Sequence, residues 1–290
     1  MPERFGFAGL GQMGAPMAGN IAGARFALTV YDKAGTAARV PEGASPVESL
    51  EELAQAAETI FLSLPDGPAT VEFAKDLVAL SDRTVTCVID LSTIGPEAAK
   101  EADGIYADAG ITYIDAPVSG GQSGARAGTI TVMWAGPKDT LESHRDVMMS
   151  MCKNLFHVGD VAGQGQAVKL LNNFLSGTAM AATSEAMAFA VSQGLDMGKV
   201  LDVVNVSTGQ NTATSDKFPN RIITGTYDAG FKTTLLAKDI RLFLENAKAA
   251  GTPSEVASTI ADLWRRCDEE LPDSDFTRVY EFLTANKKSD

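Results

Sequence analysis

The chain has 290 residues, of which 45% are hydrophobic and 21% are charged, as in an ordinary globular protein of about two domains. Its formal net charge of -13 argues against nucleic acid and anionic membranes as partners, because both need a basic surface, while a local site for an anionic substrate stays compatible with it. No apolar run reaches the roughly 18 residues of a membrane helix, and the three cysteines form no CxxC pair. We therefore expect a cytoplasmic protein without disulfides.

Short apolar runs alternate with helical patterns through the first half of the chain. The runs predict strands at residues 4–8, 26–31, 59–64, 85–90, 111–114, 129–134 and 154–158. Helical spacing lies between most of them, for example at residues 48–57, 69–80 and 96–109. This alternation predicts an α/β fold with a doubly wound, mostly parallel sheet and helices on both faces.

The second half of the chain reads as helical throughout. A long pattern rich in Ala, Leu and Met runs from about residue 166 to residue 192, and Gly194 is placed to end it. Further helices are predicted at residues 197–207, 233–250, 254–267 and 276–284. We therefore expect two domains, an α/β domain over residues 1–162 and an all-helical C-terminal domain over residues 163–290.

A glycine fingerprint, GxGxxG, follows the first predicted strand and opens a helical pattern. Its residues are Gly9, Leu10, Gly11, Gln12, Met13 and Gly14. The first glycine permits a tight turn, the second lets the backbone approach a pyrophosphate, and the third lets the helix pack closely on the strand. A glycine-rich turn without a ligand is the alternative, which the strand–turn–helix context disfavours. The pattern predicts a Rossmann-type dinucleotide-binding domain.

Asp32 ends the second predicted strand, where a carboxylate accepts hydrogen bonds from the hydroxyls of an adenosine ribose. The same charge repels the additional phosphate of NADP, so we expect NAD as the cofactor. Lys33 follows directly and softens that preference, which leaves NADP possible. The alternative is an ordinary aspartate at the end of a strand.

Four motifs in the same order resemble the β-hydroxyacid dehydrogenases, the family typified by 3-hydroxyisobutyrate dehydrogenase. They are residues 7–18 around the fingerprint, residues 115–121 (Asp-Ala-Pro-Val-Ser-Gly-Gly), the stretch from Gly163 to Asn173 and the Lys238-Asp239 pair. The resemblance implies an NAD-dependent oxidoreductase of a small carboxylate-bearing substrate, with its active site between a nucleotide-binding domain and a helical substrate and oligomerisation domain. It also implies a homodimer or a homotetramer.

Lys169 is the candidate for proton transfer at the substrate oxygen, donating as an ammonium during reduction and accepting when neutral during oxidation. A lysine has a pKa of about 10.4 in water, so this role calls for a partly dry environment or a nearby cation. Taken alone, Lys169 reads as an exposed helix lysine. Asn172 and Asn173 follow on the same helix face, and this polar patch, together with the resemblance, favours a site.

The segment Ser119, Gly120 and Gly121 follows a predicted strand, where open α/β sheets bind ligands. Its backbone amides can form an anion-binding nest, and with the Ser119 hydroxyl and Asn173 we expect it to hold a substrate carboxylate. A simple turn before the next strand is the alternative.

The remaining assignments depend on the resemblance, which also places Asn172 among the substrate-binding residues. It places four residues at the cofactor, namely Leu64, Pro65, Thr93 and Lys238. It places Phe231 and Asp239 around the substrate, with Phe231 on the face of Lys238 if their helix begins that early. Without the resemblance, Lys238 and Asp239 read as a solvated pair on a helix, and Thr93 and Pro65 as parts of a cap and a turn.

Several readings stay open beside this one. The two histidines, His144 and His157, lack partners at metal-ligand spacing, so we expect no metal site. A semialdehyde reductase of the tartronate or succinic type fits the same motifs, and the polar segment 207–219 departs from that of strict 3-hydroxyisobutyrate enzymes. Two other functions share this architecture. Imine reductases usually replace the catalytic lysine, so Lys169 argues against that function. A non-catalytic cofactor-sensing module would have lost the catalytic helix, so Lys169, Asn172 and Asn173 argue against that one.

Overall fold

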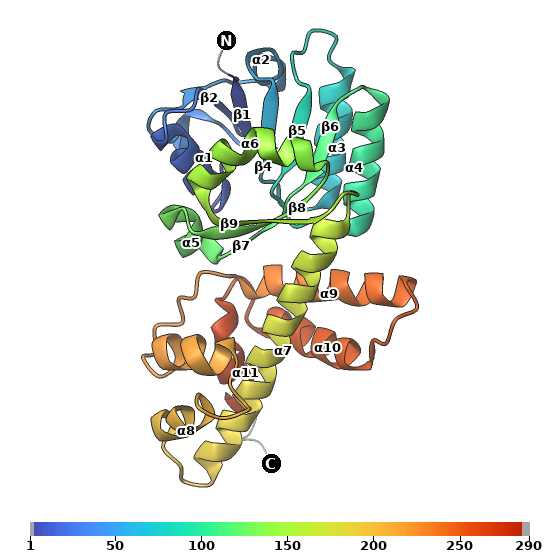
Figure 1. The fold of residues 1–290 in the computed structure, drawn as a ribbon. Coiled ribbons are helices and arrows are strands. Elements are labelled where there is room, and N and C mark those ends of the chain that lie inside the picture. Colours follow the sequence, from blue (N-terminus) through green and yellow to red (C-terminus); the bar gives the residue numbers. More distant parts are fainter. Residues whose placement is uncertain (1–2, 286–290) are drawn as a thin grey trace. The chain divides into compact units, whose positions relative to one another are not determined.

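The computed structural model describes residues 3–285, and the chain divides into two compact units, Met1–Lys169 and Leu170–Asp290 (Figure 1). The division falls inside one continuous helix, α7 (Gln164–Ser192). No helix within residues 3–285 combines the length and the apolar character that a membrane span requires.

The first unit is built on a single sheet, nine-stranded over the described residues. Its strands are β1 (Phe5–Ala8), β2 (Leu28–Tyr31), β3 (Ser45–Pro46), β4 (Thr59–Leu62), β5 (Cys87–Asp90), β6 (Thr112–Asp115), β7 (Val118–Ser119), β8 (Ile130–Ala135) and β9 (Cys152–Gly159). The order is β3-β2-β1-β4-β5-β6-β8-β7, with β9 paired to β8. All pairs are parallel except β6 with β8 and β7 with β8. This arrangement confirms the predicted Rossmann-type sheet. The strands are added outward from β1 first on one side, through β2 and β3, and then on the other side, through β4, β5 and β6, so the strand order reverses between β1 and β4.

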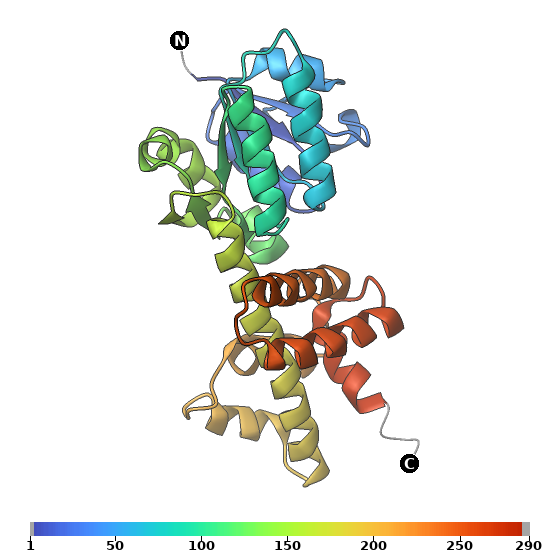
Figure 2. The same cartoon turned by 90° about the vertical axis from the view of Figure 1, so that its right-hand side faces the viewer.

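The central strands β1, β4 and β5 are fully buried, as parallel strands covered on both faces must be. The helices of this unit are α1 (Gly14–Gly23), the short η1 (Ala37–Arg39), α2 (Leu50–Ala56), α3 (Gly67–Ala79), α4 (Pro96–Asp108), α5 (Gly121–Ala127) and α6 (Lys138–Met151). One apolar layer lies between the sheet and α1 with α6, and a second lies between the sheet and α2, α3 and α4 (Figure 2).

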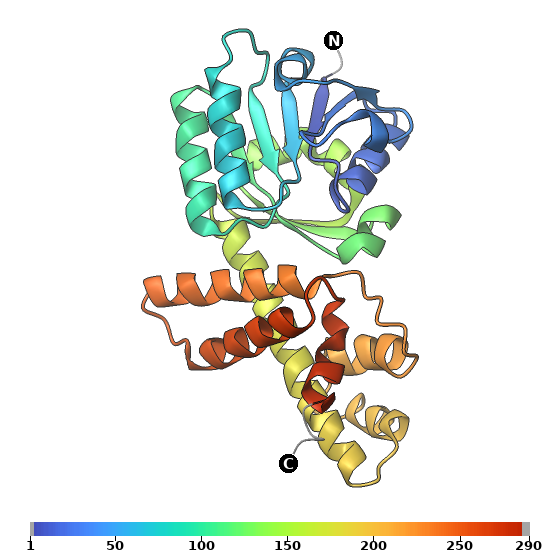
Figure 3. The same cartoon turned by 180° about the vertical axis from the view of Figure 1, so that it is seen from behind.

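The second unit is helical over its described residues, as the sequence predicts. Besides most of α7 it contains α8 (Met197–Val204), the π-helix η2 (Ala213–Ile222), α9 (Thr233–Ala249), α10 (Glu255–Glu270), the short η3 (Phe276–Arg278) and α11 (Val279–Ala285). Figure 3 shows α9 and α10 running side by side. Trp264 of α10 is fully buried, and its indole donates to the carbonyl of Gly177 in α7 across 3.2 Å, which ties the long helix to this core.

Four of the described helical elements are missing from the sequence prediction, namely η1, α5, α6 and η2. Helix α6 fills the interval between β8 and β9, α5 separates β7 from β8, and the short η1 follows β2. The apolar residues Leu141, Val147, Met148 and Met151 recur at helical spacing, and this signal identifies α6. The π-helix η2 lies in the polar segment 207–219 and contains Pro219, which a helix-period pattern cannot predict.

Candidate active site

The predicted glycine turn lies at the carboxyl end of β1. Gly9 has φ of +92°, and a Cβ atom there would meet the carbonyl oxygen of Ser63 at 2.3 Å. A Cβ on Gly14 would meet the carbonyl oxygen of Gly9 at 1.8 Å, whereas a Cβ on Gly11 would find nothing within 4 Å. The first and third glycines are therefore required by packing, and the second leaves its backbone open to a ligand. This division fits a dinucleotide pyrophosphate at the start of α1.

The other fingerprint residues continue the same turn. Leu10 is buried, Gln12 is exposed and accepts from the Gln122 amide at 2.7 Å, and Met13 is the N-cap of α1.

Asp32 is held in a fixed orientation beside this turn. Its Oδ2 accepts from the backbone amide of Leu10 at 2.7 Å, and its Oδ1 accepts from the amide of Ala34 at 2.8 Å. The guanidinium of Arg39, on η1, lies 3.0 Å from Oδ1. Lys33, which the sequence suggested as the modulating cation, instead pairs with Glu72. Sequence reasoning missed Arg39, because the fold of the loop after β2 decides which cation turns back to the carboxylate.

The loops after β4 and β5 are joined to each other at the same edge of the sheet. The backbone amide of Leu64, next to Pro65, donates to the hydroxyl of Ser92 at 2.8 Å, and Ser92 directly precedes Thr93. A Cβ on Gly9 would lie 3.3 Å from the Leu64 side chain, so the first of these loops borders the glycine turn. The structure thus brings Leu64, Pro65 and Thr93 to the edge where the predicted cofactor site lies.

Two buried carboxylates end the neighbouring strands β5 and β6, and the sequence analysis singled out neither. Asp90 accepts from the Ser92 amide at 2.9 Å and from the Tyr113 hydroxyl at 3.0 Å. Asp115 accepts from the backbone amides of Gly163 and Gln166, at 2.9 and 3.0 Å. Burial raises the pKa of Asp90 and raises the pKa of Asp115 to about 6. These carboxylates hold the loops and the start of α7, as described below.

The segment predicted to form an anion nest lies where β7 passes into α5. Ser119 ends β7, Gly120 has φ of +136° and Gly121, the first residue of α5, has φ of +62°. Both angles are readily available only to glycine. The alternative of a simple turn before the next strand is wrong, because helix α5 lies between β7 and β8.

Lys169 lies near the beginning of α7 and is 8% exposed, so it is not the exposed helix lysine of the alternative reading. Asn173, one helical turn later, is also buried, and its oxygen accepts from the Asn172 amide at 3.1 Å. The Asn173 amide donates to Oδ2 of Asp239 at 2.6 Å. Lys238 lies 3.4 Å from Oδ1 of the same carboxylate. In the helical unit the structure therefore brings Asn172, Asn173, Lys238 and Asp239 together.

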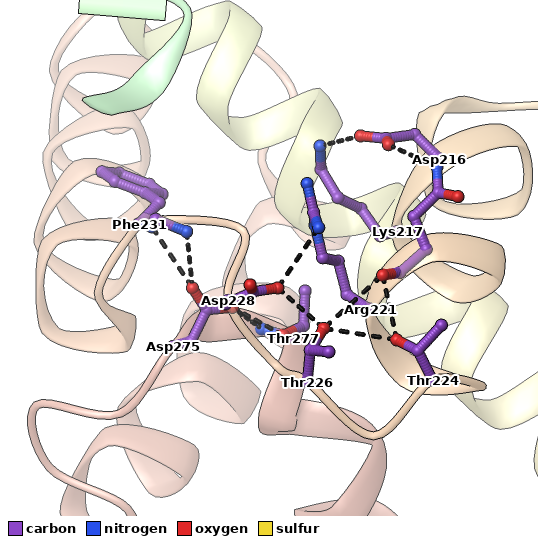
Figure 4. Close-up of polar contacts among 11 residues, drawn as sticks. Asp216, Lys217, Arg221, Thr224, Thr226, Asp228, Phe231, Asp275 and Thr277 are labelled. Carbon is purple, nitrogen blue, oxygen red and sulfur yellow. Dashed lines mark hydrogen bonds and ion pairs between the residues drawn. The ribbon is translucent and has the colours of Figure 1, made fainter. Parts of the chain in front are cut away.

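Phe231 lies just before α9 and not on it, since α9 begins at Thr233, so the expected sharing of a helix face with Lys238 is wrong. Its backbone amide faces the carboxylate of Asp275 at 3.4 Å (Figure 4). Its ring meets that of Phe276 edge-on, with 6.0 Å between the centroids.

The polar segment before Phe231 forms its own network around η2 (Figure 4). Lys217 pairs with Asp216, and Arg221 lies 3.3 Å from Asp228. Asp228 also accepts from the Thr226 hydroxyl at 2.7 Å. The Arg221–Asp228 contact thus joins the end of η2 to the chain that leads to α9.

Known proteins match this chain along most of its length. Residues 4–159 match the family model of the NAD binding domain of 6-phosphogluconate dehydrogenase, and residues 163–283 match that of the NAD-binding domain of NADP-dependent 3-hydroxyisobutyrate dehydrogenase. The 3-hydroxyisobutyrate dehydrogenase of Pseudomonas aeruginosa is 36% identical over 286 residues, which cover 94% of this chain and 96% of that protein. The chain belongs to the β-hydroxyacid dehydrogenase family.

Two further members of this family place the chain among its dehydrogenases. The 2-(hydroxymethyl)glutarate dehydrogenase of Eubacterium barkeri is 35% identical over 254 residues, covering 86% of this chain and 84% of that protein. A structure of the Mycobacterium tuberculosis 3-hydroxyisobutyrate dehydrogenase with L-serine has a TM-score of 0.89 and 31% identity, and covers 98% of this chain and 100% of that one. The predicted family, enzyme class and nicotinamide dinucleotide cofactor are confirmed by these matches. The roles of individual residues stay predictions.

Proposed function

We propose that this protein oxidises the primary alcohol of a small β-hydroxyacid to the semialdehyde, or catalyses the reverse reduction, with NAD as cofactor and Lys169 as the proton carrier. The observation that carries the proposal is the polar group on α7, where a buried lysine is followed one turn later by Asn173, itself bonded to Asp239 at 2.6 Å. Burial of polar and charged side chains costs free energy that hydrogen bonds and ion pairs must offset, whereas apolar residues would pack these helix positions at no such cost, so we take three buried polar side chains as the mark of a site.

Each predicted residue then has a chemical task. When bound, the nicotinamide ring exchanges a hydride with the hydroxyl-bearing carbon of the substrate. Lys169 accepts the hydroxyl proton during oxidation and returns it during reduction. Ser119 and the amides after Gly120 and Gly121 hold the carboxylate, with Asn172, Asn173, Phe231 and Asp239 around the rest of the substrate. The fingerprint Gly9 to Gly14, Asp32, Leu64, Pro65, Thr93 and Lys238 contact the cofactor. Most of the proposed cofactor contacts thus fall in residues 1–162, and most of the proposed substrate contacts, together with self-association, fall in residues 163–290.

The names of the three relatives support one class of substrate. 3-Hydroxyisobutyrate, L-serine and 2-(hydroxymethyl)glutarate share a hydroxymethyl group on the carbon that bears a carboxylate, and differ in the second substituent on that carbon. We propose this shared unit as the part of the substrate that Lys169 and Ser119 recognise. The second substituent then selects the substrate, and we propose that the segment 207–219, which departs from that expected of strict 3-hydroxyisobutyrate enzymes, takes part in this selection.

A panel assay tests the proposal directly. Wild-type protein is mixed with NAD and, in turn, with 3-hydroxyisobutyrate, L-serine, 2-(hydroxymethyl)glutarate, glycerate and 4-hydroxybutyrate, and the absorbance of NADH is followed. The proposal predicts turnover of at least one of the first three. Glycerate carries the same hydroxymethyl unit with a hydroxyl as the second substituent, so faster turnover of glycerate would identify a tartronate semialdehyde reductase within the proposed substrate class. Faster turnover of 4-hydroxybutyrate, which lacks this unit, would transfer the assignment to a semialdehyde reductase of the succinic type. Tight NADH binding without turnover of any acid would favour a sensing module, and reduction of a cyclic imine with NADPH alone would favour an imine reductase.

We also propose that the protein self-associates through the helical unit. Leu171, Leu175 and Phe189 are 49%, 58% and 65% exposed, and they recur along α7 at intervals close to whole helical turns. A run of large apolar side chains on one helix face marks an interface. Light scattering after size-exclusion chromatography tests this, and Phe189→Glu is expected to lower the observed mass if the proposal is correct.

A further inference from the structure

Gln166 lies at the centre of a hydrogen-bonded network that the predicted reaction does not use. The residue is fully buried in the first turn of α7, and both ends of its side-chain amide have two partners. Its nitrogen donates to the carbonyl of Ser92 at 3.0 Å and to Oδ1 of Asp115 at 2.7 Å. Its oxygen accepts from the backbone amides of Ile94 and Gly95, at 2.9 and 3.1 Å.

This network reaches three loops at the carboxyl edge of the sheet. Three of the four partners flank Thr93, in the loop after β5. Asp115 ends β6 and also binds the Gly163 and Gln166 amides, so it fixes the beginning of α7. Ser92 in turn accepts from the Leu64 amide in the loop after β4. One side chain therefore links the loop around Thr93 to the helix turn that ends in Lys169, three residues after Gln166.

The side chain must be an amide for this arrangement to work. Two acceptors face its nitrogen and two donors face its oxygen, so neither an apolar side chain nor an ionised carboxylate satisfies all four. A buried polar network of this kind is stable and rigid only when every member is paired. Such a network also transmits any displacement of one segment to the others.

We propose that Gln166 is a positioning residue, which couples the Ser92–Gly95 loop to the first turn of α7 and so fixes Lys169 relative to the cofactor-binding loop. The inference rests on the proposed function, in which Lys169 transfers the proton. A displacement of about 1 Å at a catalytic group can reduce a rate by on the order of 10²-fold, so a residue with no part in the chemistry can still control the rate.

Hydrogen exchange measured by mass spectrometry tests the coupling without reference to activity. In Gln166→Leu, amide exchange is expected to accelerate both in residues 92–95 and in residues 163–170, with residues 9–14 unchanged. The matched control is Gln164→Leu, because Gln164 is exposed in the same helix turn and its side-chain oxygen accepts from the backbone amide of Val161, within its own segment. The control is expected to affect residues 161–166 alone. Acceleration confined to one segment in Gln166→Leu would overturn the proposal.

Kinetics on the best substrate of the panel form the second arm. Gln166→Leu is expected to lower kcat by on the order of 10²-fold, with a smaller change in the NADH dissociation constant and in KM. The Gln164→Leu control keeps its kcat. Equal losses in both variants would show that fraying of the helix end, and not the link through Gln166, reduces the rate. If Lys169→Ala instead keeps full turnover, the proposed function fails, while the exchange arm still decides whether the two segments are coupled.

Gln166→Glu supplies a rescue that a merely structural role would not show. When protonated, the introduced carboxyl group retains the two bonds from Ile94 and Gly95 and donates one to Asp115 or Ser92. When ionised it faces Asp115, with Asp90 one strand further on, and like charges repel. The variant is expected to approach wild-type kcat at pH 5.5 and to lose on the order of tenfold relative to wild type at pH 8.5. A ratio to wild type that is constant with pH would contradict the proposal.

Discussion

The side-chain amide of Asn173 donates to the carboxylate of Asp239 across 2.6 Å, joining α7 to α9 inside the helical unit. Both residues are buried, so this hydrogen bond takes the place of one that the Asp239 carboxylate would otherwise make with water. We expect Asn173→Ala to lower the free energy of unfolding by about 1–3 kcal/mol and to raise KM for the acid substrate. Urea unfolding and steady-state kinetics measure these two effects. If the variant keeps the wild-type KM, Asn173 does not contact the substrate and its role is structural.

Two glycines of the fingerprint are needed for different reasons, Gly14 for packing and Gly11 for binding of the cofactor. Gly14→Ala places a methyl group 1.8 Å from the carbonyl oxygen of Gly9, so we expect a loss of stability of about 1–3 kcal/mol or more. Gly11→Ala meets nothing within 4 Å, so we expect an unchanged melting temperature but at least a tenfold weaker binding of NADH. Thermal melting and titration of NADH fluorescence distinguish the two variants. Full NADH affinity in Gly11→Ala would show that the pyrophosphate of the cofactor does not bind at this turn.

Asp32 and Arg39 make opposite contributions to the choice of cofactor. The carboxylate favours the ribose hydroxyls of NAD, whereas the guanidinium, 3.0 Å from it, offers a partner to a 2′-phosphate. We expect the wild type to bind NADH more tightly than NADPH. Arg39→Ala should widen this preference, and Asp32→Ala should narrow or reverse it. Dissociation constants for both cofactors with all three proteins provide the measurement, and tighter binding of NADPH by the wild type would contradict the expected role of Asp32.

The buried carboxyl of Asp115 makes stability depend on pH. Burial raises its pKa from 3.8 to about 6, so the folded chain binds more protons than the unfolded chain between these values. Its contribution to the free energy of unfolding therefore falls as pH rises through this window and stays low above it. Asp115→Asn removes the dependence, so the free energy of unfolding of the variant minus that of the wild type should increase from pH 4 to pH 7, by at most about 3 kcal/mol. Urea unfolding at each pH tests this, and a constant or decreasing difference would contradict it.

Local patterns predicted the sheet and most helices because each strand or helix carries its own periodicity. The buried runs of β1, β4 and β5 and the glycine turn after β1 are visible in the residues themselves. Helix α6 also carries helically spaced apolar residues, so the signal that identifies it is present in its sequence. The π-helix η2 has no such periodicity, and its turns depend on Asn211, whose side chain accepts from the amides of Ala213 and Thr214.

Only those residues of the candidate site that belong to a sequence motif could be predicted from the sequence. The pairing of Asn173 with Asp239 joins residues 66 apart, and that of Gln166 with Asp115 joins residues 51 apart. Such pairs depend on how the elements pack, which no local pattern contains. Gln166 in particular reads in the sequence as one more polar residue at a helix start, and only its complete burial reveals that it belongs to a network.

The central claim is that Lys169 carries the proton, and chemical rescue of Lys169→Ala measures this most directly. The variant should bind NADH like the wild type but turn over the best substrate of the panel about 10²–10⁴-fold more slowly. Added methylamine or ethylamine should restore part of the rate in proportion to its concentration, because a free amine can replace the missing side chain. Wild-type turnover by Lys169→Ala without any amine would contradict the account.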